Sequence, residues 1–185
     1  MTYEKTGRRA KVRVQRRREA DASAMLMWND ALSSIDAANQ LGAEEMRFGT
    51  VRLHLVTRGI ELAMKSLLRA RGWTLDRIQT ELGHSLNDIL AALANLGTKP
   101  PTGAVRSWLE LLSEARERRE LRYAHTDHPT HMDRSDWIVA AEWALRAAIP
   151  AVAEAEAGKD AKGLVRTMQA RTTRVVHPGA ASGPL

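Results

Sequence analysis

Two side-chain types that suit phosphate chemistry crowd into one short stretch of the sequence. Residues 118–131 contain three arginines and then three of the chain's six histidines: Arg118, Arg119, Arg122, His125, His128 and His131. A guanidinium group is permanently charged and binds phosphate oxygens in pairs. An imidazole group titrates near neutral pH and can take up or release a proton. Together they predict a site that holds a phosphate and moves a proton.

The helix that leads into this stretch places two of the arginines where apolar residues would be expected. Its apolar residues are Val105, Trp108, Leu112 and Ala115. The same three-to-four spacing continues to Arg119 and Arg122, which therefore fall on the face that meets the rest of the fold. A buried guanidinium needs a partner. That partner is a bound anion, or a carboxylate such as Glu117 or Glu120, a carbonyl or water.

The apolar pattern of the whole chain predicts helices and no strands. We expect helices over about 21–41, 45–70, 85–97 and 102–123, a short turn from Thr74 to Leu82, and a last helix from Asp133 or Ser135. Pro150 is expected to end or kink that last helix. The predicted fold class is all-α, an antiparallel bundle of four to five helices with basic, disordered N- and C-terminal tails.

Charge divides the chain into three parts. Residues 1–20 hold eight Lys/Arg and two Glu, a net charge of +6, and residues 158–185 hold five Lys/Arg and one Asp, a net charge of +4. Residues 21–157 hold fifteen Lys/Arg and nineteen Asp/Glu, a net charge of −4. We predict a basic N-terminal arm at 1–20, a helical bundle at 21–157 and a flexible C-terminal tail at 158–185. Basic segments of this kind suit nucleic-acid phosphates or serve only solubility.

Composition excludes several classes of site and protein. The chain has no cysteine, so disulfides, thiolate metal ligands and cysteine nucleophiles are excluded. It has no apolar run of about 18 residues, and its basic start lacks the apolar core of a secretory signal. We therefore expect a cytoplasmic protein that does not insert into a membrane.

Three stretches resemble the HEPN domain family in order and spacing: Ile60–Leu68 with Gly72, Gly83–Leu86 with Ile89 and Leu90, and Leu121–Tyr123. The resemblance covers about residues 24–148. It implies an all-α bundle that often dimerises, and either a metal-independent endoribonuclease or a non-catalytic module that binds a nucleotide or a protein partner. Many ribonuclease members are toxins or phage-defence effectors, so an antitoxin or nucleotidyltransferase partner is implied as well.

The ribonuclease members carry an arginine and, four to six residues later, a histidine. Arg122 and His128 have five residues between them, as do Arg119 and His125, whereas Arg118 and His125 have six. The resemblance thus implies Arg122, His128, Arg119 and His125 as catalytic residues, with the arginines on the phosphate and a histidine as base or acid. Tyr123, Lys65 and Arg118 are expected to help bind RNA.

Other interpretations of the same residues stay open. The arginines would instead pair with acidic side chains, leaving solvated histidines in a loop. A metal ion held by His125, His128 and His131 is a weaker alternative, because Pro129 makes the segment irregular, and no metal or other cofactor is predicted. His84 precedes a helix start and is expected to cap or pack there rather than to catalyse.

Overall fold

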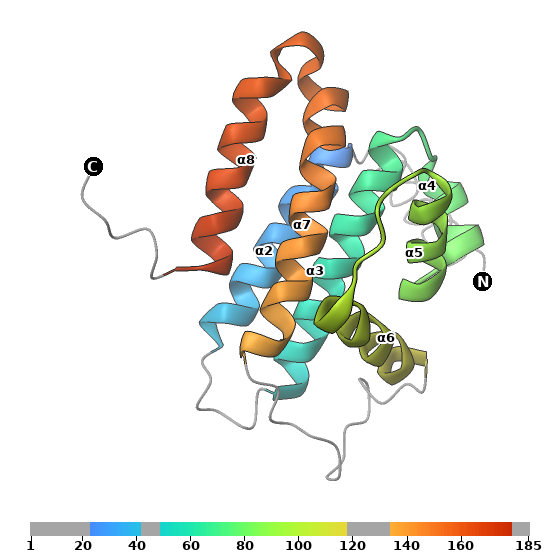
Figure 1. Cartoon of the computed structure of the whole chain (residues 1–185), viewed down its shortest axis with the longest axis vertical. Helices are drawn as coiled ribbons and strands as arrows, with labels where there is room; N and C mark the ends of the chain where they lie inside the picture. Colours follow the sequence, from blue (N-terminus) through green and yellow to red (C-terminus); the bar gives the residue numbers. More distant parts are fainter. Residues whose placement is uncertain (1–22, 42–48, 118–133, 179–185) are drawn as a thin grey trace, which may run out of the picture.

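The computed structural model describes residues 23–41, 49–117 and 134–178. Every regular element in these ranges is helical, and the long helices pack side by side (Figure 1). The prediction of an all-α bundle is therefore confirmed. Within the described ranges, no helix combines the length and apolar character needed to cross a membrane.

Two antiparallel helices, α2 (Ala24–Gln40) and α3 (Gly49–Ala70), form the centre of the bundle. The side chain of Ser23 caps α2 by accepting a hydrogen bond from the backbone N–H of Leu26 at 3.1 Å. The helices approach closely at Gly59, where an added Cβ would lie 2.6 Å from Ile35 Cδ1. The buried residues Val56, Ile60, Ala63 and Leu67 recur every three to four positions and form the apolar seam of α3.

The chain then reverses through short elements. α3 ends before Gly72, whose φ of 91° suits glycine, and α4 (Leu75–Arg77) runs into a π-helical turn, η2 (Ile78–Leu82). The side chains of Thr74 and Ser85 cap the helices that follow them, accepting from Arg77 N and Asp88 N at 3.2 Å each. α5 (Leu86–Asn95) and α6 (Gly103–Glu117) complete this side of the bundle.

The helix α7 (Arg134–Ala157) passes through Pro150 instead of ending there. Pro150 itself is exposed, whereas Ala151, Val152 and Ala153 beyond it are buried. Packing of that last turn offsets the cost of proline inside a helix, about 3 kcal/mol. Of the two outcomes predicted for Pro150, an end or a kink of the helix, the structure therefore excludes the end.

The predicted flexible tail at 158–185 is also corrected over most of its length. A short 3₁₀ turn, η4 (Gly158–Asp160), reverses the chain, and α8 (Ala161–Val176) packs back against α7 and α2 (Figure 1). Gly158 makes the reversal with a φ of 52°. Met168, Thr172 and Val176 are buried, so α8 belongs to the core.

Polar contacts tie the first and last helices together across the bundle. The fully buried Trp28 donates its indole Nε1–H to the carbonyl of Leu145 at 3.2 Å. Asn39 donates to the carbonyl of Val175 at 2.7 Å, and Arg171 donates to Asn29 Oδ1 at 2.8 Å. These contacts fix α2, α7 and α8 as one layer.

Candidate functional site

Most of the residues that the sequence predicts as a site lie outside the described ranges. Residues 118–133 hold Arg118, Arg119, Arg122, Tyr123, His125 and His128, so their predicted roles stay predictions. The structure does place the two ends of that segment. α6 ends at Glu117 and α7 begins at Arg134, and the two helices pack against each other. The arginine- and histidine-rich segment is therefore held to the bundle at both ends.

Lys65 is the one predicted site residue that the structure describes, and it is buried. Its Nζ donates to Glu61 Oε1 at 2.6 Å, one helical turn earlier on α3. Side-chain exposure is 8% for Lys65 and 4% for Glu61. Lys65 also donates to the backbone carbonyl of Gly83, in the turn before α5. A buried cation is thus satisfied by a carboxylate and a carbonyl, as its desolvation requires.

The same carboxylate oxygen holds an imidazole at the surface. His84 Nδ1 lies 2.9 Å from Glu61 Oε1, while 69% of the His84 side chain is exposed. Because the carboxylate accepts, Nδ1 carries the proton in this contact. His84 Nε2 has no hydrogen-bond partner among the described residues. His84 therefore neither caps α5, which Ser85 does, nor packs in the core, contrary to the expectation from sequence.

We call Glu61, Lys65, Gly83 and His84 the α3–α5 cluster. A carboxylate that orients one imidazole nitrogen leaves the other nitrogen to act as a base, an acid or a hydrogen-bond donor. Lys65 balances the charge of Glu61 from the buried side. The cluster can thus present an oriented imidazole at the surface without leaving a buried charge unpaired.

The sequence predicts one contact of this cluster, between Glu61 and Lys65, but not the contact with His84. Glu61 and Lys65 are four residues apart on a helix, which predicts their pairing. The adjacent Ile60 lies on the apolar seam, which is the available signal that the pair is buried. Contact with His84, 23 residues further on, depends on how α5 docks and has no local signal.

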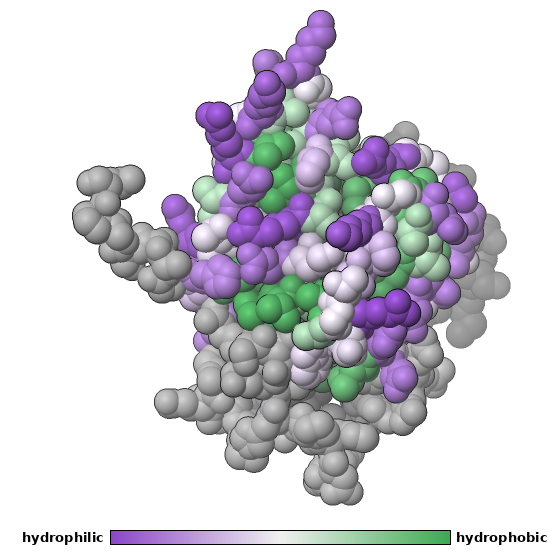
Figure 2. Space-filling model, in the orientation of Figure 1, coloured by the Kyte–Doolittle hydropathy of each residue, from purple (hydrophilic) through white to green (hydrophobic). Residues whose placement is uncertain are grey.

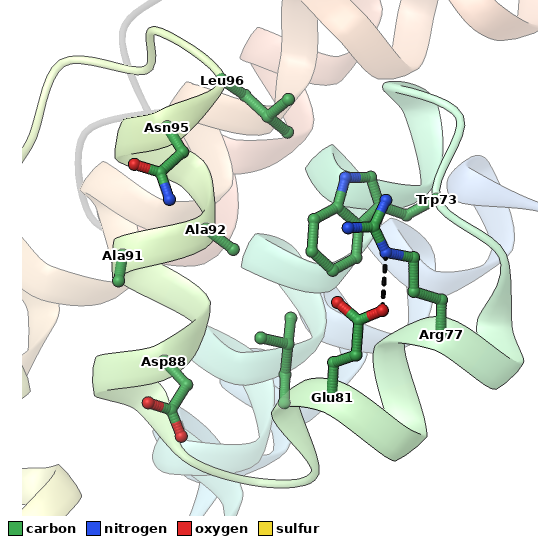
Figure 3. A pocket seen from close by; sticks show the side chains of 9 residues that line it. Trp73, Arg77, Glu81, Asp88, Ala91, Ala92, Asn95 and Leu96 are labelled. Atoms are coloured by element: carbon green, nitrogen blue, oxygen red, sulfur yellow. Dashed lines mark hydrogen bonds and ion pairs between the residues drawn. The ribbon is translucent and has the colours of Figure 1, made fainter.

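A groove that was not predicted from the sequence lies between α4, η2 and α5. It has a cavity volume of about 490 Å³, and its wall includes Trp73, Arg77, Glu81, Asp88, Asn95 and Leu96 (Figure 3). We call it the Trp73 groove. Its volume falls within the usual range for small-ligand sites, about 300–1,000 Å³.

One wall of the Trp73 groove is formed by Arg77, which stacks on the Trp73 ring. The guanidinium of Arg77 lies 3.6 Å from the centre of the Trp73 ring, and Arg77 Nε donates to Glu81 Oε1 at 2.9 Å. The facing wall of α5 offers small apolar residues with Asp88 and Asn95 at either end (Figure 3). Such a groove suits a flat ring that stacks on the guanidinium and donates hydrogen bonds to the carboxylate or amide.

Neither feature has the composition of a metal site. Among residues 23–41, 49–117 and 134–178, no three His, Asp or Glu side chains gather closely enough to hold a metal ion. The described clusters therefore offer acid–base and hydrogen-bonding chemistry of their own side chains.

Comparisons with known proteins return nothing for this chain. No protein-family model matches it, and neither a curated protein nor a solved structure is similar to it. The family resemblance thus rests on the sequence motifs alone.

Proposed function

We propose that this protein is a metal-independent endoribonuclease of the HEPN type, acting as a toxin or phage-defence effector. The observation that carries the proposal is the α3–α5 cluster. Two sequence motifs that suggested the family separately, one around Glu61 and Lys65 and one at Gly83–Leu86, meet at hydrogen-bond distance. Their meeting within an all-α bundle is the observation that supports the proposal.

The proposed chemistry divides between binding and proton transfer. Arg119 and Arg122 hold the scissile phosphate and stabilise its developing charge. His125 or His128 takes the proton of the ribose 2′-hydroxyl or protonates the leaving oxygen. Arg118 and Tyr123 support RNA binding. Lys65 is buried and bonded to Glu61 and to the Gly83 carbonyl, so its contribution is to hold the α3–α5 cluster together.

Two copies of the chain complete the reaction in this proposal. One histidine per subunit supplies a base in one copy and an acid in the other, if the segments meet across a two-fold axis. The proposed partners are therefore RNA, a second copy of the chain, and an antitoxin or nucleotidyltransferase that restrains the activity in the cytoplasm.

An RNA-cleavage assay with a metal chelator present tests the proposal. Wild type should cleave, and Arg122→Ala and His128→Ala, or Arg119→Ala and His125→Ala, should lose about 10²-fold or more. Arg58→Ala, which removes an exposed arginine of α3, is the matched control. Equal cleavage by wild type and all four variants would end the proposal.

The Trp73 groove favours a second candidate, a non-catalytic module that binds a nucleotide or a protein partner. The Arg77–Trp73 stack provides a platform for a base, and Asp88 provides an acceptor for an exocyclic amino group. Binding of nucleosides, followed by calorimetry, should weaken about fivefold or more in Trp73→Ala, because Trp73 holds Arg77 in the platform and a stacked base contributes about 1–3 kcal/mol. No binding by wild type would remove this candidate.

A further inference from the structure

The basic charge of the C-terminal region is carried by an ordered helix rather than by a tail. Residues 158–178 contain five Lys/Arg and a single acidic residue, Asp160. Four of the cations, Lys162, Arg166, Arg171 and Arg174, lie on α8, which has no acidic residue. α8 therefore forms a cationic rod on a bundle whose residues 21–157 have a net charge of −4.

The helical period sorts the residues of α8 into two faces. Met168, Thr172 and Val176 are buried against α7 and α2. At 100° per residue, Arg166 and Arg174 fall on the opposite half, around the small residues Gly163 and Ala170, and Lys162 lies at its edge. All five of these residues are exposed, and hydrophilic side chains project along the visible side of α8 (Figure 2).

The three outward cations have no partner in the described part of the protein. Arg171, by contrast, is held by Asn29 and lies 5.4 Å from the Trp28 ring centre. Glu142 on α7 is engaged by Arg146 at 2.7 Å and faces His177 at 3.2 Å. No described ion pair neutralises Lys162, Arg166 or Arg174, so their charge is available to an outside partner.

We infer that the outer face of α8 binds the phosphodiester backbone of RNA through Lys162, Arg166 and Arg174. The three side chains span about 18 Å along the helix, at a rise of about 1.5 Å per residue. That span covers several consecutive phosphates of an extended strand. Gly163 and Ala170 have short side chains between the cations, so the strand can approach the helix closely.

The choice of RNA among polyanions rests on the proposed function, and it deepens that function. For residues 118–131 to cleave RNA, the strand must stay bound to the protein for as long as the cleavage step takes. A track of cations on α8 supplies sequence-independent affinity for the RNA backbone. The α8 face therefore acts as a docking strip and contains no catalytic residue.

Binding of an uncleavable RNA tests the inference apart from cleavage. A labelled 2′-O-methyl oligoribonucleotide is titrated with the full chain by fluorescence anisotropy, between about 50 and 200 mM salt. The variant Lys162→Gln/Arg166→Gln/Arg174→Gln should lower the salt slope of the logarithm of affinity by about 2, since each lost phosphate contact removes about 0.7. Circular dichroism confirms that both proteins are equally helical.

A matched variant separates a docking strip from net charge alone. Arg58→Gln/Arg71→Gln/Lys99→Gln removes three exposed cations elsewhere: Arg58 on α3, Arg71 just after α3 and Lys99 after α5. This variant should leave the salt slope close to that of wild type. An equal loss in both variants, or no loss in the α8 variant, overturns the inference. Preferential, α8-dependent binding to phosphatidylserine vesicles also overturns it, since the occupant would be a membrane surface.

The two proposals can fail separately in these experiments. If wild type binds the 2′-O-methyl strand through α8 but cleaves no RNA, the proposed ribonuclease is wrong and the docking strip stands. If wild type cleaves RNA and the α8 variant keeps its slope and affinity, the ribonuclease stands and the docking strip is wrong.

Discussion

Lys65 Nζ lies 2.6 Å from Glu61 Oε1, and the exposure of both side chains is below one-tenth. The two side chains of a salt bridge at this depth depend on each other, because water cannot solvate either charged group when its partner is removed. Glu61 also contacts His84, so the same carboxylate joins the centre of α3 to the turn before α5. The pair therefore links the stability of the bundle to the position of a surface imidazole.

Removing one member of this pair should destabilise the protein strongly. Lys65→Met leaves the carboxylate of Glu61 buried without its cation, and we expect a loss of about 3–5 kcal/mol in the free energy of unfolding. Urea unfolding followed by circular dichroism measures it. Lys99→Met, at an exposed lysine, is the control and should change stability by less than about 0.5 kcal/mol.

The double variant Glu61→Leu/Lys65→Met completes a thermodynamic cycle. Because it removes both charges, its cost should fall well below the sum of the two single costs. Additive costs would show that the two side chains act independently, despite the distance between them.

The α2–α3 contact makes a separate prediction at Gly59. A methyl group there would lie 2.6 Å from Ile35 Cδ1 and 3.1 Å from the carbonyl of Ala31, so Gly59→Ala forces either the Ile35 side chain or the two helices to shift. We expect a loss of about 1–3 kcal/mol in a thermal or urea unfolding measurement.

The control for Gly59 is another glycine inside a helix. Nothing lies within 4 Å of a Cβ added at Gly163 of α8, so Gly163→Ala should stabilise the protein by about 0.5–1 kcal/mol. Destabilisation by both substitutions to the same degree would contradict the close approach at Gly59.

Much of the fold follows from local sequence, because helical period and caps are local signals. The seam of α3, the cap at Ser85 and the stop at Gly72 each depend on residues within a few positions of one another. α8 was missed because Gly158, Gly163 and its many arginines are typical of a tail. Its apolar residues Met168 and Val176 are buried because α8 packs on α7 and α2, and local sequence does not predict that packing.

The candidate site is less predictable than the fold, since its contacts join distant residues. The pairing of Glu61 with Lys65 follows from four-residue spacing, but its burial and its bond to His84 depend on the docking of α5. The Trp73 groove likewise depends on how η2 faces α5. Neither arrangement leaves a pattern within one helix.

His84 gives a prediction that separates function from stability. Its side chain is 69% exposed, so His84→Ala should cost less than about 1 kcal/mol of unfolding free energy. If the oriented imidazole takes part in RNA cleavage, activity should fall about 10²-fold. His54→Ala, at an exposed histidine of α3, is the matched control, and equal cleavage by both variants would remove His84 from the reaction.

Adjacent residues of α8 test whether this helix is part of the core. Met168 is fully buried, so Met168→Ala should lower the free energy of unfolding by about 2–5 kcal/mol through lost burial and a residual cavity. The neighbouring Gln169 is exposed, and Gln169→Ala should be neutral within about 0.5 kcal/mol. Urea unfolding of the two variants beside wild type measures the difference. A flexible tail would make both substitutions neutral, so a stable Met168→Ala protein would contradict the packing of α8 and, with it, the rigid spacing of the three cations on its outer face.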